Sequence, residues 1–266
     1  MSYIQPANHI PFILKSETEI IKDAFRSLDA TNGGIETYPI CDYLLHSLFL
    51  RLTGAQEQKL KCICWEMACR DYEYRYERYE RKPYGECSSY DDKCMVYNDL
   101  LNEIKKLDES FTVTDAIKDG ILDDWKVSIQ RVFENSLLAQ NFKKSYGEYK
   151  VLVANVRKSW IMNKKQLFTK KDNISELERQ ATCGLVLQEL FTDYVYKERN
   201  RCAHNTRSYQ HNLPSIKEMM SKGYKLQNYF LYMSIIILLD KIYIKLFEIY
   251  LSLIPQHYNL TLFISS

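Results

Sequence analysis

One short segment of the chain combines residue types that suit phosphodiester chemistry. It reads Glu-Arg-Asn-Arg-Cys-Ala-His-Asn over residues 198–205, and Arg207 and His211 follow it. A histidine can take or give a proton near neutral pH, and an arginine can grip two phosphate oxygens and stabilise developing negative charge. An obligate cation, an amide and an imidazole within six residues therefore indicate chemistry at a phosphodiester.

The pattern Arg199-Asn200-x3-His204, followed by Asn205, resembles the R-x4-6-H signature of the HEPN superfamily, in the form found in HEPN ribonucleases. That group includes toxins, abortive-infection proteins and RNA-targeting CRISPR effectors. The resemblance covers about ten residues, together with the helical character of the chain and the late position of the motif. It implies a metal-independent endoribonuclease with no cofactor, acting in toxin or antiviral defence.

The resemblance also implies a role for each residue of the motif. His204 would act as general base or acid at the ribose 2′-hydroxyl, Arg199 would bind the scissile phosphate, and Asn200 would orient the phosphate or His204. The products would be a 2′,3′-cyclic phosphate and a 5′-hydroxyl. HEPN ribonucleases pair two Arg/His sets across a two-fold axis, and this chain has one motif. The implied partners are therefore RNA, a second copy of the chain in a homodimer, and a regulatory or neutralising protein.

The same residues are also typical of a helix C-terminus, where basic side chains complement the helix dipole and Asn205 is a stop signal. On an ideal helix, Arg199 and His204 point about 140° apart. The expected site therefore needs the helix to end or kink between them. The alternative function is a non-catalytic helical module that binds RNA, a nucleotide or a protein.

A basic stretch precedes the motif. Residues 141–171 hold nine Lys or Arg against one acid, Glu148, with Tyr146, Tyr149 and Trp160 interleaved. This composition suits contact with an RNA backbone and stacking on bases, although a solvated helix face explains it as well. The residues expected to contact RNA are Arg157, Lys158, Lys164 and Lys165 from this stretch, with Arg201 and Arg207 from the motif segment.

A second group of candidate residues is the set of cysteines between positions 62 and 94. Their spacing lacks a C-x2-C pair, and Cys62, Cys64 and Cys69 cannot share one helix face. We therefore predict reduced structural thiols here and no metal site.

Helical periodicity and scarce Gly and Pro (8 and 6) predict an all-α bundle, with no segment alternating at period two. One helix is expected to begin at Ser16, whose Ser16-x-x-Glu19 pattern fits a capping box, and another at Thr114. Breaks in the helix over 142–168 are expected near Gly147 and Asn163. Further helices are expected over residues 40–52, 55–81, 91–107, 142–168, 172–201 and 227–253. Residues 1–110 would form an N-terminal helical extension of a HEPN-like domain, 111–266, in one compact unit.

Bulk properties limit the class of protein. The formal net charge of the 266 residues is only +2, which excludes a polybasic nucleic-acid coat. The longest apolar stretch, 229–239, is too short to span a bilayer, and no secretory signal is visible. We therefore expect a cytoplasmic protein with no membrane contact.

Overall fold

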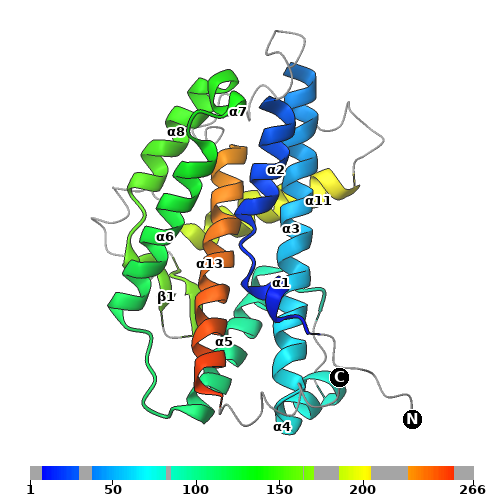
Figure 1. The fold of residues 1–266 in the computed structure, drawn as a ribbon, viewed down its shortest axis with the longest axis vertical. Coiled ribbons are helices and arrows are strands. Elements are labelled where there is room, and N and C mark those ends of the chain that lie inside the picture. The colour runs from blue at the N-terminus through cyan, green and yellow to red at the C-terminus, as the bar shows by residue number, and fades with distance from the viewer. Residues whose placement is uncertain are drawn as a thin grey trace.

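The computed structural model describes residues 8–29, 38–81, 85–163, 165–170, 186–204 and 227–254, and these ranges are almost entirely helical. The prediction of an all-α bundle is confirmed. Most long helices run side by side around one buried apolar cluster (Figure 1). They are α2 (Thr18–Asp29), α3 (Tyr38–Ala68), α5 (Tyr90–Leu107), α6 (Asp115–Phe133), α8 (Lys143–Ala154) and α13 (Tyr229–Leu253), with the short α1 (Ile10–Leu14) and α7 (Leu137–Asn141) between them.

Helix α13 is the centre of the bundle (Figure 1). It packs against α3, α5, α6 and α8, so elements from both halves of the chain share it. The five consecutive aliphatic residues from Ile235 to Leu239 are each at most 1% exposed. A helix that is apolar on every face is stable only when other elements surround it, and this explains why the most apolar segment takes the central place.

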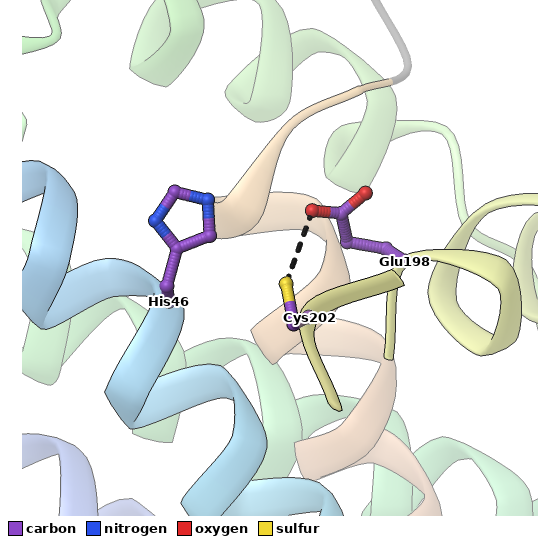
Figure 2. A group of neighbouring side chains, drawn as sticks. All are labelled: His46, Glu198 and Cys202. Carbon is purple, nitrogen blue, oxygen red and sulfur yellow. Dashed lines mark hydrogen bonds between the residues drawn. The ribbon is translucent and has the colours of Figure 1, made fainter. Parts of the chain in front are cut away.

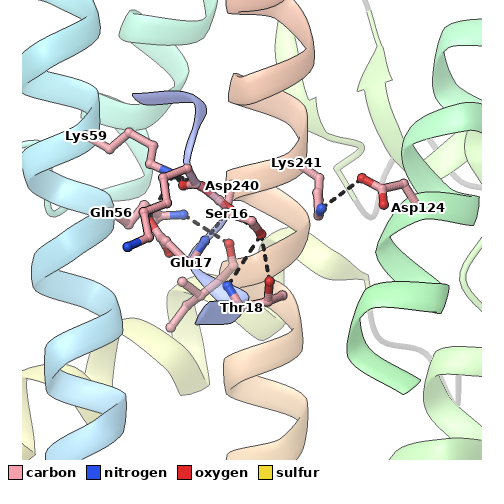
Figure 3. Close-up of polar contacts among 10 residues, drawn as sticks. Ser16, Glu17, Thr18, Gln56, Lys59, Asp124, Asp240 and Lys241 are labelled. Carbon is pink, nitrogen blue, oxygen red and sulfur yellow. Dashed lines mark hydrogen bonds and ion pairs between the residues drawn. The ribbon is translucent and has the colours of Figure 1, made fainter. Parts of the chain in front are cut away.

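A buried polar cluster joins the N-terminal segment to α13 (Figure 3). Lys59 of α3 forms an ion pair with Asp240 of α13 and donates to the backbone oxygen of Lys15 at 2.7 Å. The backbone N–H of Glu17 donates to Asp240 Oδ2 at 2.9 Å. Because Glu17, Lys59 and Asp240 are at most 3% exposed, their contacts fix the start of α2 against α3 and α13.

Helix α3 merges residues that were expected in two helices. Gly54 lies exposed in its middle and does not interrupt it, because Leu52 and Leu60 on either side are fully buried. The helix expected to reach residue 81 ends at Ala68 instead. After a turn, Asp71 caps α4 (Tyr72–Arg75) by accepting from Tyr74 N at 3.0 Å, and the chain continues as the π-helix η2 (Tyr76–Arg81).

The predicted helix starts have different outcomes. Thr114 caps α6 by accepting from Ile117 N at 3.4 Å, so this prediction is confirmed. The capping box at Ser16 is wrong, because Glu19 forms an ion pair with Lys22 at 2.5 Å, and the Ser16 hydroxyl accepts from Thr18 N at 3.4 Å. The break expected near Gly147 is absent, since α8 runs through it.

A small hairpin, unexpected from the sequence, follows α8 and the 3-10 turn η3 (Lys158–Trp160). Strand β1 (Ile161–Asn163) pairs antiparallel with β2 (Gln166–Phe168), with Ile161 opposite Phe168. The Tyr90 hydroxyl of α5 accepts from Phe168 N at 3.0 Å and donates to Phe168 O at 3.2 Å. The expectation of no strand was wrong because three residues are too few to show a period of two.

Two properties of the described part of the chain bear on the sequence predictions. None of its helices is both long and apolar enough to cross a bilayer. Its cysteines carry no disulfide, and Cys62, Cys64 and Cys87 are buried in the core.

Candidate active site on helix α11

The Arg/His motif lies on a helical run that crosses the bundle behind the long helices (Figure 1). The run begins with α10 (Leu187–Glu189), continues as the π-helix η5 (Leu190–Val195) and ends with α11 (Tyr196–His204). Leu190, Phe191 and Val195 bury the inner side of η5 and hold the run against the core. Single π-helical turns occur frequently at functional sites, and this one directly precedes the motif.

Arg199 is held by two neighbours. One guanidinium nitrogen, Nη2, forms an ion pair with Glu57 Oε2 of α3 at 3.1 Å, and Nη1 donates to Asn200 Oδ1 at 3.1 Å. The side chains of Arg199 and Glu57 are 26% and 15% exposed, so the pair lies at the edge of the core. The first two residues of the motif therefore form one hydrogen-bonded unit, and a carboxylate from α3 neutralises it.

His204 ends α11, and its side chain lies outside the described part of the structure. The helix continues without a break from Tyr196 to His204, so the expected end or kink between Arg199 and His204 is absent. The two residues leave the helix axis in directions about 140° apart. Arg199 and His204 therefore occupy positions on different faces of α11.

A small cavity lies beside the Arg199–Glu57 pair. Lys93 of α5, only 2% exposed, also lines it and donates to Cys87 O at 2.6 Å. Burial lowers the pKa of Lys93 to about 8, and the charge of Glu57 opposes this effect. Two basic side chains and one carboxylate therefore line the cavity. Its lining is Thr53, Gln56, Glu57, Ser88, Lys93, Phe191, Val195, Tyr196 and Arg199.

The other residues predicted to contact RNA form ion pairs within the protein, are exposed, or lie outside the described part of the structure. Arg201 forms an ion pair with Glu198 at 2.7 Å and stays 35% exposed. Lys158 forms ion pairs with Asp115 at 3.4 Å and Asp119 at 3.1 Å, both on α6. Arg157 and Lys165 are exposed, whereas Lys164 and Arg207 lie outside the described residues. Acidic residues of α6, outside the basic stretch, thus partly neutralise its charge.

The aromatic residues of the basic stretch are not arranged as a stacking platform. Tyr149 and Trp160 are each only 3% exposed, so the expectation that they stack on RNA bases was wrong. Tyr146 stacks on Tyr149 with ring centroids 5.8 Å apart, and Lys150 covers its ring at 5.0 Å. The helical periodicity of α8 turns these rings toward Phe230 and the core.

Sequence reasoning missed Glu57 and Lys93, which complete the surroundings of Arg199. Glu57 lies 142 positions before Arg199, and no local pattern marks it. Nor does the sequence mark Lys93, which looks like an ordinary charged residue in the first turns of a helix. Only the packing of α3 and α5 against the motif run brings these groups together.

Comparison with known proteins gives no relative from which to transfer a function. No family model matches the sequence, and searches of curated proteins and of solved structures found no match. The function of the site is therefore argued from its own residues.

Proposed function

We propose that this chain is a metal-independent endoribonuclease that acts as a homodimer in toxin or antiviral defence. The observation that carries the proposal is the Arg199–Asn200 unit, a partly exposed guanidinium linked to an amide beside a small cavity that Lys93 also lines. The defence role rests on the resemblance of the motif to HEPN ribonucleases.

Glu57 has a definite place in this proposal. Its carboxylate occupies the guanidinium nitrogen that would otherwise bind a phosphate oxygen. A scissile phosphate carries the same charge as this carboxylate, so it can replace Glu57 without leaving Arg199 unpaired. Glu57 then holds the guanidinium in place before RNA binds and gives way when it does.

The composite site follows from the helix geometry. Because α11 directs Arg199 and His204 apart, the residues that act on one phosphate come from two protomers. Arg199 and Asn200 of one protomer hold the phosphate and stabilise the charge of the transition state. The partner's His204 removes the proton of the 2′-hydroxyl, and the 2′-oxygen attacks the phosphorus and breaks its bond to the 5′-oxygen. The 5′-oxygen takes up a proton from water, so the products are a 2′,3′-cyclic phosphate and a 5′-hydroxyl.

The direct test is RNA cleavage in EDTA by the wild-type protein and by Arg199→Ala and His204→Ala. We expect each variant to lose about 10²–10³-fold in rate, and DNA to stay intact. Lys197→Ala is the matched control, because Lys197 lies on the same helix, is exposed and pairs with Asp193 at 2.9 Å. Cleavage that all four proteins share would come from a contaminating nuclease and would refute the proposal.

Glu57→Gln separates a phosphate-binding Arg199 from a purely structural one. If Arg199 binds phosphate, removing the competing charge keeps cleavage and tightens RNA binding severalfold, because the guanidinium is freer. If the ion pair only stabilises the fold, Glu57→Gln and Arg199→Ala lower stability together, and neither alters RNA affinity in the folded protein. Filter binding and thermal melting of both variants distinguish these results.

A second candidate function is a non-catalytic module that binds RNA, a nucleotide or a protein. The observation that favours it is the ion pair between Arg199 and Glu57 on an unbroken helix, in which Arg199 already has a protein partner. This reading predicts RNA binding that depends on Arg199, with no cleavage by the wild type at any protein concentration.

A further inference from the structure

Three side chains with metal-binding atoms meet between α3 and the motif helix (Figure 2). They are His46 of α3 and Glu198 and Cys202 of α11, and one ligand atom of each lies within 4.8 Å of the others. Glu198 is 8% exposed, and His46 and Cys202 are half-buried. The cluster joins a nitrogen, an oxygen and a sulfur donor from two elements about 150 positions apart.

The helix spacing accounts for two of the three donors. Glu198 and Cys202 are four residues apart, so they lie on the same face of α11, and Cys202 Sγ donates to a Glu198 carboxylate oxygen at 3.4 Å. Two such ligands on a tetrahedral zinc ion, bonded at their usual lengths, lie about 3.5 Å apart. The distance between the carboxylate oxygen and the thiol sulfur therefore already matches that between two ligands of one zinc ion.

Neighbouring groups hold the side chains of Glu198 and His46 in place. The Tyr229 hydroxyl, at the start of α13, donates to Glu198 Oε1 at 2.5 Å, and Arg201 pairs with the same carboxylate at 2.7 Å. The imidazole of His46 packs edge-on against the Tyr229 ring, with centroids 5.1 Å apart at 75°. Contacts of this kind, from residues just outside the ligand set, orient the ligands of metal sites in proteins.

We propose that His46, Glu198 and Cys202 bind one Zn²⁺ ion, which links α11 to α3. A nitrogen, a carboxylate and a sulfur donor suit zinc and disfavour Mg²⁺ and Ca²⁺, which take oxygen ligands. Binding replaces the thiol proton, so one proton is released for each ion bound, and the thiolate and carboxylate together neutralise the ion.

The ion is a structural link and takes no part in RNA cleavage. Cys202 lies less than one helical turn from Arg199, so an ion at Cys202 fixes the end of the helix that carries Arg199 and Asn200. The zinc site does not depend on the ribonuclease proposal, because an ion that links α11 to α3 would stabilise a non-catalytic module equally well. Cleavage in EDTA is therefore measured below the melting temperature of the metal-free protein.

The test is zinc binding to full-length protein stripped of metal with a chelator. Calorimetry should give one ion per chain, and zinc at a hundredfold excess over its Kd should raise the Tm by roughly 5–10 °C. Mg²⁺ should leave the Tm unchanged. Cys202→Ser and His46→Ala should each weaken binding more than tenfold, whereas the matched controls Cys69→Ser and His9→Ala should not.

Cobalt substitution tests the site without any mutation. Co²⁺ bound here should show the charge-transfer absorption of a cobalt–thiolate bond. Equal zinc affinity of wild type and Cys202→Ser, or a cobalt spectrum without a thiolate band, would overturn the assignment. Because these readouts use no RNA, a failure here leaves the ribonuclease proposal standing, and the reverse is also true.

Discussion

At the scale of single residues, the buried cluster around Asp240 contains one more carboxylate than it has lysines to balance. Lys59 pairs with Asp240, whereas Glu17 Oε1 is 4.0 Å from Lys59 Nζ and neither carboxylate oxygen of Glu17 has a hydrogen-bond partner. Burial, and then the charge of Asp240, raise the pKa of Glu17 well above its ordinary value. Glu17 therefore holds its proton to a higher pH than an ordinary glutamate, and Lys59 and Asp240 form the close ion pair.

This assignment predicts opposite effects for two substitutions. Glu17→Gln should leave the free energy of unfolding at pH 7 unchanged or raise it, because it removes a carboxyl that resists ionisation. Lys59→Met should lower it by about 3–5 kcal/mol, since Asp240 is left buried without its partner. Urea titrations measure both. Lys197→Met, at an exposed ion pair, is the control and should change stability by less than about 0.5 kcal/mol.

The same carboxyl predicts a pH dependence. A carboxyl whose pKa is raised in the folded state binds its proton more tightly there. Its contribution to stability is complete below the unfolded pKa of about 4.3 and is lost as pH rises through the folded value. The stability of Glu17→Gln relative to wild type should therefore increase as pH rises above 5. A constant difference between the two proteins from pH 5 to 8 would contradict this assignment.

Lys93 gives the opposite case, a base whose pKa burial lowers to about 8. The unfolded chain then binds more protons than the folded one between pH 8 and the unfolded pKa of about 10.4, so stability should rise with pH in that window. Lys93→Met should be more stable than wild type at pH 7 by about 1–3 kcal/mol and lose this rise. Chemical unfolding at pH 7, 8 and 9.5 is the measurement, and a steeper rise in the variant would contradict the explanation.

At the scale of elements, the sequence predicted helices where local signals agree with packing and failed where tertiary contacts override them. Thr114 begins α6 as expected, because its cap is a contact between neighbours in the chain. The split expected near residues 53–54 did not occur. Burial of Leu52 and Leu60 against the core outweighs the cost of about 1 kcal/mol for Gly54 inside a helix.

Gly54 therefore marks a position where the helix can be improved. A Cβ added there meets no heavy atom within 4 Å, so Gly54→Ala should raise the free energy of unfolding by about 0.5–1 kcal/mol. Gly85→Ala is the matched control, because its Cβ would lie 3.0 Å from the Asp92 carboxylate and should bring no such gain. Urea unfolding of both variants tests this, and a destabilised Gly54→Ala would mean that α3 bends or opens at that point.

The candidate site was predictable to the same limited extent. The adjacency of Arg199 and Asn200 was visible in the sequence, and so was the four-residue spacing of Glu198 and Cys202, although its significance was missed. The partners Glu57 and His46 come from α3, and only the crossing of α11 over that helix identifies them. Residue types and local spacing thus predict which groups are available, whereas the packing of helices decides which of them meet.

At the scale of the whole molecule, the weak net charge of +2 and the pairing of Lys158 with α6 acids leave little long-range attraction for RNA. The proposed RNA binding would then depend on a concentrated local arrangement, which two motif helices facing each other across a two-fold axis would supply. In that arrangement both protomers contribute to each phosphate, and cleavage requires the dimer.

Mixing experiments distinguish a shared site from two independent ones. Wild-type protein is mixed with an equal amount of the Arg199→Ala, His204→Ala double variant and left until subunits exchange. If the site is shared, each site of a mixed dimer lacks either Arg199 or His204, so the mixed dimer is inactive. About half of the wild-type chains then lie in mixed dimers, and cleavage per wild-type chain should fall to about half. If each chain acts alone, that rate stays constant. Light scattering on the same samples, together with a rate per chain that rises with protein concentration, would tie the loss to dimer formation.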